Sequence, residues 1–364
     1  MLVLDNKVTA AVLTMPDVVR ALEESYRDLA DGTGVCRPRI DLNLPVDDSR
    51  VYRWGTMEGG SARSGYVALR MKSDVLTETG PPGLRTQEKY CVRPGLFCGL
   101  VLLLDARTGE PLALLNDGLL QHLRVGADSA IGVRFAARED ARVLGLLGSG
   151  GMARSHVEAF LTVRPLERIQ VFSPTRGHRE RFAAEMRELH GLDVVAVDEP
   201  ELAHRGADIV AGCTDAVGDV VLGGHLSPGT HVTCIGGHPD ARARERFDVW
   251  LRLGSAGVPV SNPSWATDDE YVGYRAAPDA PVWRHHHERG PKPAPGHARR
   301  VALEAVLAGR DRARDDERQV TFSERGNIQG AQFHAVAAVV YERARERGLG
   351  HEIPREWLLQ DIRD

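Results

Sequence analysis

The sequence predicts an α/β protein built around a doubly wound parallel sheet, with a second, smaller α+β domain beside it. The chain has 364 residues, which is more than one hydrophobic core usually supports, so two domains are expected. From near Ala127 onward, apolar strand-like segments alternate with amphipathic helical segments. Three glycines within positions 148–151 stand between one such strand and the helix that follows it.

The alternating part of the chain carries the prediction of a parallel sheet. Helices are expected from Met152, from Arg179 and near Glu199. Strands are expected at residues 141–148, 168–173, 192–197, 207–213, 230–237 and 248–253. Strands joined through helices form right-handed crossovers, which give a parallel sheet covered by helices on both faces.

The first part of the chain has a different pattern. A helix is expected from Met15 to Asp31, and strand-like segments lie at 65–73 and 98–105. The turn signal from Asp105 to Gly109, followed by the apolar segment 111–117, predicts a hairpin. Near the end of the chain, apolar residues at helical spacing before a glycine predict a long terminal helix that packs on this first part.

These patterns divide the chain into residues 1–125 with 322–364 as one domain and residues 126–321 as the parallel-sheet domain. Within the second, the segment at about 274–319 is rich in Pro, Ala, Arg and His, and we expect it to be an insertion on the surface. The triple histidine 285–287 in this segment could bind a metal, but consecutive residues point in different directions, so a solvated loop is expected and no metal is predicted.

Composition excludes several classes of partner. The net charge of −5 and the 42% of hydrophobic residues suit a small-molecule partner, with no nucleic acid and no membrane expected. The five cysteines show no close pairing, which argues against a disulfide framework and a zinc site. With no apolar run long enough to span a bilayer and no leader pattern at the first residues, a cytoplasmic protein is expected.

The glycine-rich segment matches a dinucleotide fingerprint. Gly148, Gly150 and Ala153 form GxGxxA between a predicted strand and a predicted helix. Gly148 allows the tight turn, Gly150 lets the backbone approach the pyrophosphate, and Ala153 permits close helix packing, while the helix N-terminus holds the phosphate charge. Gly151 and Met152 complete the segment. The alternative is that the glycines only punctuate a loop.

The end of the second strand of this unit bears on the choice of cofactor. An acidic residue there binds the ribose hydroxyls of NAD, whereas this chain offers Ser173, Thr175 and Arg176. Hydroxyls and a guanidinium suit a 2′-phosphate, so NADPH is favoured and NADH is the second option. The alternative is a plain turn with a solvated Arg176.

The residues also carry a family resemblance. The segments 122–153, 68–73 and 227–237, together with the region of Gly326, resemble the ornithine cyclodeaminase and mu-crystallin family. The resemblance implies a nicotinamide-binding Rossmann domain in the middle of the chain and a second domain for substrate and dimerisation, and hence a homodimer. Activities in the family include cyclodeamination of ornithine, alanine dehydrogenation and reduction of ketimines.

The same resemblance implies the site residues. Arg39, Lys72 and Arg124 match the family's substrate-binding cations, and such cations beside a nicotinamide bind the carboxylate of an α-keto or α-imino acid. Lys72 can also donate a proton. For each cation the alternative is a solvated surface charge. Further cofactor contacts are expected at Cys213, Thr214, Ile235, Gly236 and Gly326.

The chain departs from the cyclodeaminases after the fifth strand. Those enzymes resemble one another in an Asp that handles the substrate amine, and this chain has His238 at that position, or Asp240 if the loop is shifted by two residues. An imidazole titrates near neutral pH, so His238 could donate a proton to the nascent amine; the alternative is a loop histidine in solvent. The departure favours NADPH-dependent reduction of the C=N bond of an α-imino acid or ketimine, or amino-acid dehydrogenation in reverse. The alternatives are an ammonia lyase that uses NAD catalytically and a non-enzymatic NADPH-dependent binding protein.

Overall fold

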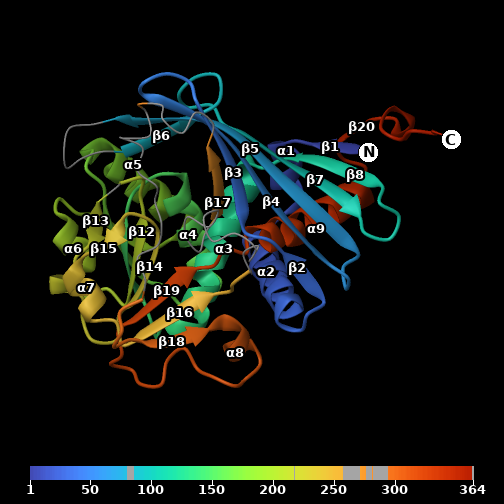
Figure 1. Ribbon diagram of the computed structural model, residues 1–364. Helices are drawn as coiled ribbons and strands as arrows, with labels where there is room; N and C mark the ends of the chain where they lie inside the picture. The colour runs from blue at the N-terminus through green and yellow to red at the C-terminus, as the bar shows by residue number, and fades with distance from the viewer. Residues whose placement is uncertain (80–85, 217, 257–270, 276–280, 282–293, 363–364) are drawn as a thin grey trace.

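The computed structural model describes residues 1–79, 86–216, 218–256, 271–275, 281 and 294–362. Figure 1 shows two sheets, one drawn in green to red and the other mainly in blue and cyan, with helices lying between them. The first is an eight-stranded parallel sheet and the second is a ten-stranded mixed sheet.

The parallel sheet has the strand order β11-β10-β9-β12-β14-β19-β16-β18, and every neighbouring pair is parallel. Its strands are β9 (Val143–Leu147), β10 (Arg168–Phe172), β11 (Asp193–Ala196), β12 (Ile209–Cys213), β14 (His231–Gly236), β16 (Val249–Leu253), β18 (Arg299–Ala302) and β19 (Thr321–Arg325). Chain order reverses direction between β9 and β12, which is the arrangement of a doubly wound sheet. The predicted fold class is confirmed.

The helices of this half are α4 (Gly151–Leu161), α5 (Arg176–His190), α6 (Pro200–His204), α7 (Ala241–Glu245) and α8 (Leu303–Leu307). The expected helices from Met152, from Arg179 and near Glu199 correspond to α4, α5 and α6. Two short strands, β13 (Asp219–Val221) and β15 (His238–Pro239), pair with each other beside the parallel sheet.

The mixed sheet has the order β17-β3-β4-β5-β7-β8-β1-β20, with β2 paired to β4 and β6 paired to β5. Its strands are β1 (Leu2–Leu4), β2 (Gly34–Cys36), β3 (Arg39–Pro45), β4 (Arg50–Ser61), β5 (Tyr66–Thr79), β6 (Thr86–Tyr90), β7 (Cys98–Asp105), β8 (Pro111–Asn116), β17 (Tyr271–Arg275) and β20 (His351–Glu352). The hairpin of β7 and β8 is confirmed, and its turn ends at Gly109 with a φ of +77°.

Four helices accompany the mixed sheet: α1 (Asn6–Val12), α2 (Met15–Ala30), α3 (Gly118–Ala136) and the terminal helix α9 (Gln329–Glu346). Helix α9 packs on β4 through backbone contact, because a Cβ at Gly59 would lie 2.4 Å from the carbonyl carbon of Gly330. The predicted helix at 15–31 and the predicted terminal helix are both confirmed. Figure 1 shows α3 and α9 on the side of the mixed sheet that faces the parallel sheet.

Helix α3 joins the two halves. A Cβ at Gly126 would lie 2.5 Å from the Ser155 carbonyl oxygen of α4, and one at Gly132 would lie 2.5 Å from Ser323 Oγ of β19. Glycine at these two positions lets α3 lie directly on the parallel-sheet half. The expected domain boundary at 125/126 falls inside this helix, and β19 belongs to the parallel sheet, so we propose a division after residue 117 and again after residue 328.

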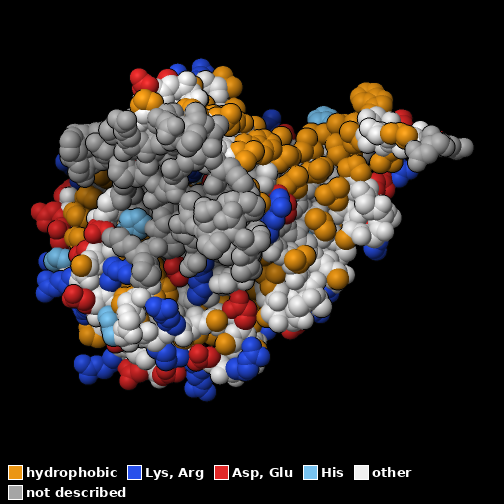
Figure 2. Space-filling view, in the orientation of Figure 1, with side chains coloured by type: hydrophobic (Ala, Val, Ile, Leu, Met, Phe, Trp, Pro, Cys, Tyr) orange, Lys and Arg blue, Asp and Glu red, His pale blue; other side chains and the backbone are white. Residues whose placement is uncertain are grey.

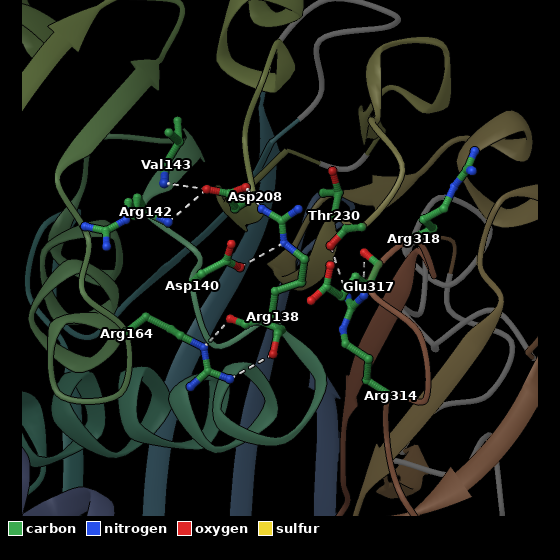
Figure 3. A network of polar contacts seen from close by, with 12 residues as sticks. Arg138, Asp140, Arg142, Val143, Arg164, Asp208, Thr230, Arg314, Glu317 and Arg318 are labelled. Carbon is green, nitrogen blue, oxygen red and sulfur yellow. Dashed lines mark hydrogen bonds and ion pairs between the residues drawn. The ribbon is translucent and has the colours of Figure 1, made fainter.

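The C-terminal end of α3 is fixed by two arginines from other segments, the buried Arg164 and the half-buried Arg314 (Figure 3). Arg164 Nη2 donates to the carbonyl oxygens of Val133, Arg134 and Ala137 at 2.8–2.9 Å. Arg314 Nε donates to Ala136 O at 2.8 Å. Val133 O also accepts from Ala137 N at 3.0 Å. The last carbonyls of a helix lack donors further along it, and the two guanidinium groups supply donors to them.

The segment at 274–319 is a correction to the sequence analysis. Its residues 274 and 275 end β17, which pairs with β3 at one edge of the mixed sheet, and β18 pairs with β16 at the edge of the parallel sheet. The described part of this segment therefore contains strands of both sheets, which were not expected, while its residues 308–319 are mostly exposed. Val301 is the one buried apolar residue within β18. The sequence of this strand therefore has no apolar pattern that would predict a strand. The triple histidine lies outside the described residues.

No helix among the described residues is both long enough and apolar enough to cross a membrane. The same residues contain no group of three or more His, Cys, Asp or Glu side chains placed to hold a metal ion.

Candidate active site between the two sheets

The glycine loop after β9 is closed on one side and open on the other. Gly148 has a φ of +120°, and a Cβ there would lie 2.1 Å from the carbonyl oxygen of Cys213. Gly150 precedes α4, and a Cβ there would meet no atom within 4 Å. Ala153 is fully buried. An open backbone at the N-terminus of an eleven-residue helix is the arrangement that a pyrophosphate needs, so these residues fit a dinucleotide.

Gly151 has its own physical reason, which comes from α3. A Cβ at this position would lie 2.9 Å from His122 Nε2. The His122 ring is itself fixed by a 2.8 Å hydrogen bond between Nδ1 and Gly118 O. The glycine therefore accommodates the histidine, and the sequence motif gives no sign of that contact. Met152, which follows it, packs against the hydrophobic core.

The end of β10 presents hydroxyl and guanidinium groups. Ser173 is buried, and Ser149 Oγ of the glycine loop donates to its Oγ at 3.0 Å. Thr175 and Arg176 are exposed, and Arg176 Nε donates to Glu180 Oε1 at 2.7 Å. Arg179, which the motif analysis missed, is buried and donates to Ser173 O at 3.0 Å. Arg179 also forms an ion pair with Asp198, so the end of this strand carries hydroxyls and two guanidinium groups that are each paired with a carboxylate.

The remaining predicted cofactor residues lie at the same edge of the parallel sheet. Cys213 and Thr214 end β12, Ile235 and Gly236 end β14, and Gly326 follows β19. A Cβ at Gly236 would lie 1.8 Å from Thr214 O, and one at Gly326 would lie 2.3 Å from Leu253 O. Both glycines thus allow neighbouring backbones to touch. Because the carboxyl ends of parallel strands share one edge, all five positions border the crevice in which open α/β sheets bind ligands.

Arg124 is buried in the first half of α3, on the side away from α4. Its Nη1 donates to Gln332 Oε1 at 2.5 Å and its Nη2 donates to Gln121 Oε1 at 2.8 Å. The guanidinium carbon lies 4.7 Å from the centre of the Phe333 ring. Burial lowers the pKa of Arg124, and the neighbouring cations Arg325 and Arg70 lower it further. These hydrogen bonds go to neutral amides, so the positive charge is left for a ligand.

Lys72 is buried on the inner face of β5, and its Nζ donates to Asp74 Oδ2 at 2.8 Å. Burial lowers the pKa of Lys72 to about 8, with a contribution from the positive charge of Arg39. A Cβ at Gly55 on the neighbouring strand would lie 2.8 Å from Lys72 Cε and 2.5 Å from Asp41 Oδ1. Glycine at this position allows both side chains to lie across β4.

Arg39 lies on β3 close to this lysine. Its Nη2 forms an ion pair with Asp41 Oδ2 at 2.9 Å, and Asp41 is completely buried. Arg39 is therefore held within the sheet by a carboxylate.

The structure brings Lys72 and Arg124 toward one another through Arg70. Arg70 and Lys72 share one face of β5, and Arg70 and Arg124 both lie against the ring of Phe333, at 5.1 and 4.7 Å from its centre. Arg325 also acts electrostatically on Arg124, and it immediately precedes Gly326 at the carboxyl edge of the parallel sheet. Arg124 and Arg70 thus lie near the carboxyl edge of the parallel sheet, and Lys72 is the next residue on the same face of β5.

Asp240 is a correction. Its Oδ1 accepts hydrogen bonds from Ala243 N at 2.6 Å and from Gly223 N at 3.1 Å, so this carboxylate caps α7 and fixes the preceding turn. Both bonds are accepted by Oδ1, so the Asp240 side chain is fixed at the N-terminus of α7. His238 lies in β15, is half-buried and has its backbone paired with β13.

Two further cations on the inner face of the mixed sheet were missed by the sequence analysis. Arg53 of β4 is buried and donates to Asn43 Oδ1 at 2.7 Å. Lys89 lies on β6, a strand that the sequence analysis did not predict. The alternation of Arg70, Lys72 and Asp74 was the available signal, because period-2 charge marks one face of a strand.

Several known proteins are similar to this chain in sequence and in fold. The chain matches the Ornithine cyclodeaminase/mu-crystallin family over residues 92–348. It is 28% identical over 255 residues to the Delta(1)-pyrroline-2-carboxylate reductase of Bacillus cereus, covering 70% of this chain and 74% of that protein.

Two solved structures are similar over nearly the whole length. One is the Delta(1)-pyrroline-2-carboxylate reductase of Thermococcus litoralis in complex with NADH and L-proline, with a TM-score of 0.73 at 22% identity, covering 97% of this chain and 100% of that one. The other is the iminosuccinate reductase of Paracoccus denitrificans in complex with NAD+, with a TM-score of 0.72 at 22% identity, covering 97% and 99%. At this identity the likeness establishes the fold, and the family match confirms the resemblance found in the sequence. The chain belongs to the ornithine cyclodeaminase/mu-crystallin family.

Proposed function

We propose that this protein is an NADPH-dependent oxidoreductase that reduces the C=N bond of an α-imino acid or cyclic ketimine. The observation that carries the proposal is the placement of two buried cations, Arg124 and Lys72, beside the carboxyl edge of a parallel sheet that has an open glycine loop. The cations suit a carboxylate, and the loop suits a dinucleotide. The names of the related reductases support this reaction class.

The glycine loop and the end of β10 would hold the cofactor, which supplies the hydride. NADPH is proposed because Ser173, Thr175 and Arg176 offer hydroxyls and a guanidinium, the groups that suit a 2′-phosphate. The similar structures hold NADH or NAD+, so NADH remains the second option.

The chain's own groups bind the substrate and move the proton. Arg124 offers a charge that its amide partners do not neutralise. Arg39 and Lys72, each ion-paired with an aspartate, offer further hydrogen-bond donors on the side of the mixed sheet. Lys72, with a pKa of about 8, is protonated at neutral pH and close to the pKa at which proton transfer is efficient. It would protonate the substrate nitrogen, with His238 as the second candidate donor.

The structure weakens one alternative. An ammonia lyase of the ornithine cyclodeaminase type needs a carboxylate for the substrate amine after β14, and Asp240 is occupied in capping α7. A lyase would release ammonia from a diamino acid without net cofactor change. A non-enzymatic NADPH-dependent binding protein would bind the cofactor and leave it unoxidised.

We also propose a homodimer through the outer face of the mixed sheet. On this face Met71 lies opposite Leu100, and Leu69 lies opposite Leu102, which in turn lies opposite Leu114. Leu42 of β3 continues it and is 44% exposed. Figure 2 shows hydrophobic side chains gathered in a band over the strands that Figure 1 labels β5, β7 and β8. Large exposed apolar faces mark interfaces between proteins.

The test follows NADPH absorbance with Δ1-pyrroline-2-carboxylate and with several 2-oxo acids, each with and without methylamine. Imine reduction is supported by NADPH oxidation with Δ1-pyrroline-2-carboxylate alone, or with a 2-oxo acid only when methylamine is present. Steady oxidation of NADPH would eliminate the binding-protein alternative, and ammonia release from ornithine with no change in absorbance would establish the lyase. If no member of the panel oxidises NADPH, the proposed reductase is wrong.

A further inference from the structure

The inner face of the mixed sheet carries an array of charged side chains that extends beyond the cations already assigned. In register, Asp41 lies opposite Gly55, which lies opposite Lys72, and in the next row Arg53 lies opposite Asp74. These residues come from β3, β4 and β5 and point to one face, because directly paired residues share a face of a sheet.

Lys89 extends this array on β6. It pairs with Leu76, which lies on the same face of β5 as Lys72 and Asp74. The charged groups that act most strongly on Lys89 are Lys72, Arg39, Asp74 and Arg53, which places its ammonium among them. Within the described part of the chain, Lys89 Nζ has no hydrogen-bonding partner.

The charges of this array do not balance. Asp74 is paired with Lys72 at 2.8 Å, and Asp41 with Arg39 at 2.9 Å. Asp41 Oδ2 also lies 3.5 Å from Arg53 Nε, so the four cations Arg39, Arg53, Lys72 and Lys89 share two carboxylates. With the carboxylate of an α-imino acid at Lys72 and Arg124, Lys89 is still a cation of this array that forms no ion pair with any described residue.

We propose that Lys89 binds a second carboxylate of the substrate, so that the preferred imino acid is a dicarboxylic one. The proposal rests on the proposed reductase function and specifies its substrate class. Lys72 and Lys89 lie on adjacent strands about four residues apart, or roughly 13 Å along the sheet, and two long side chains from these positions can hold the two ends of a small dicarboxylate. A cationic side chain, such as that of ornithine, would meet like charge at Lys89.

The acid–base state of Lys89 supports this assignment. Burial and the neighbouring cations Lys72 and Arg39 lower the pKa of Lys89 to about 7. An anion bound beside it favours the protonated form, so a carboxylate ligand would stabilise the ammonium that this surrounding otherwise disfavours.

The test compares two substrates that differ only at the distal end. The imines formed from 2-oxoglutarate and from 2-oxopentanoate with methylamine have the same five-carbon chain, ending in a carboxylate or a methyl group. Wild-type protein is expected to show a higher kcat/KM for the 2-oxoglutarate imine. Lys89→Gln should lower the ratio of the two kcat/KM values about 10- to 100-fold, which is what one hydrogen bond between charged groups contributes. Lys7→Gln, at an exposed position on α1, is the matched control and should leave the ratio unchanged.

Binding separates this inference from the reaction itself. The thermal unfolding midpoint is measured with NADP+ and either 2-oxoglutarate or 2-oxopentanoate, without amine. The inference predicts a larger stabilisation by 2-oxoglutarate in wild-type protein and loss of that difference in Lys89→Gln, even if no NADPH is consumed in the assay. Equal stabilisation by both acids, or a preference that Lys89→Gln retains, would overturn it.

Discussion

The pH dependence of the reaction tests the role of Lys72 most directly. Burial lowers the pKa of Lys72 from 10.5 to about 8, and Asp74 raises it by opposing that effect. The lowered pKa corresponds to about 3 kcal/mol of lost preference for the charged form. If the ammonium donates the proton to the substrate nitrogen, kcat/KM for imine reduction is constant below pH 8 and falls above it as Lys72 loses its proton.

Asp74→Asn identifies the group responsible for that fall. The carboxylate lies 2.8 Å from Lys72 Nζ, and an opposite charge at this distance typically moves a pKa by about one to three pH units. Removing it lowers the pKa of Lys72, so the falling limb should move to lower pH by about one to two units. Ionisation of the substrate is the same for both proteins and cannot produce a difference between them.

The assay measures NADPH oxidation with Δ1-pyrroline-2-carboxylate from pH 6 to pH 10 for wild type, Asp74→Asn and Lys72→Met. Lys72→Met loses both the carboxylate contact and the proton donor, and its kcat/KM should fall about 10²- to 10⁴-fold with NADPH binding retained. The reasoning is refuted if kcat/KM of Asp74→Asn falls at the same pH as that of wild type. It is also refuted if kcat/KM of Lys72→Met stays within threefold of the wild-type value with the same pH dependence.

Three other predictions concern the rest of the site and the fold. Arg124→Met should raise the KM for the imino acid about 10- to 100-fold at unchanged NADPH affinity, because the guanidinium is hydrogen-bonded to neutral amides and can bind the carboxylate. An unchanged KM would contradict this assignment. Arg176→Gln should raise the KM for NADPH about tenfold and change the KM for NADH little, since only NADPH carries the 2′-phosphate. Equal changes in the two KM values would count against the proposed preference for NADPH. Arg164→Met should lower the free energy of unfolding, measured by urea titration, by about 2–4 kcal/mol, because carbonyls at the end of α3 lose the guanidinium as a donor. A loss below about 1 kcal/mol would show that water replaces the guanidinium.

The regular elements of the parallel-sheet half were predictable because their signals are local. A short apolar segment before Gly148 and a helical pattern after Gly150 identify a strand, a turn and a helix, and these lie at β9 and α4. The hairpin of β7 and β8 was predictable for the same reason, since Gly109 terminates a turn between two apolar segments.

Other elements depend on partners distant in the chain. β18 has one buried apolar residue, and β17 borders β3 from more than 200 residues away, so neither had a pattern of its own. Asp240 had the right residue type for an amine-binding carboxylate, and its role was decided by the backbone donors that the fold places around it.

The sequence by itself determined the doubly wound half, the fingerprint at 148–153, the family and the cations Arg39, Lys72 and Arg124, because residue type and short-range periodicity carry that information. Only the tertiary structure decided what those cations face. The register of β4, β5 and β6 places Lys72 and Lys89 on one face of the mixed sheet, and the packing of α3 sets His122 against Gly151. Pairing between strands and contact between helices are properties of the folded chain, and they fix which charges meet and which remain for a ligand.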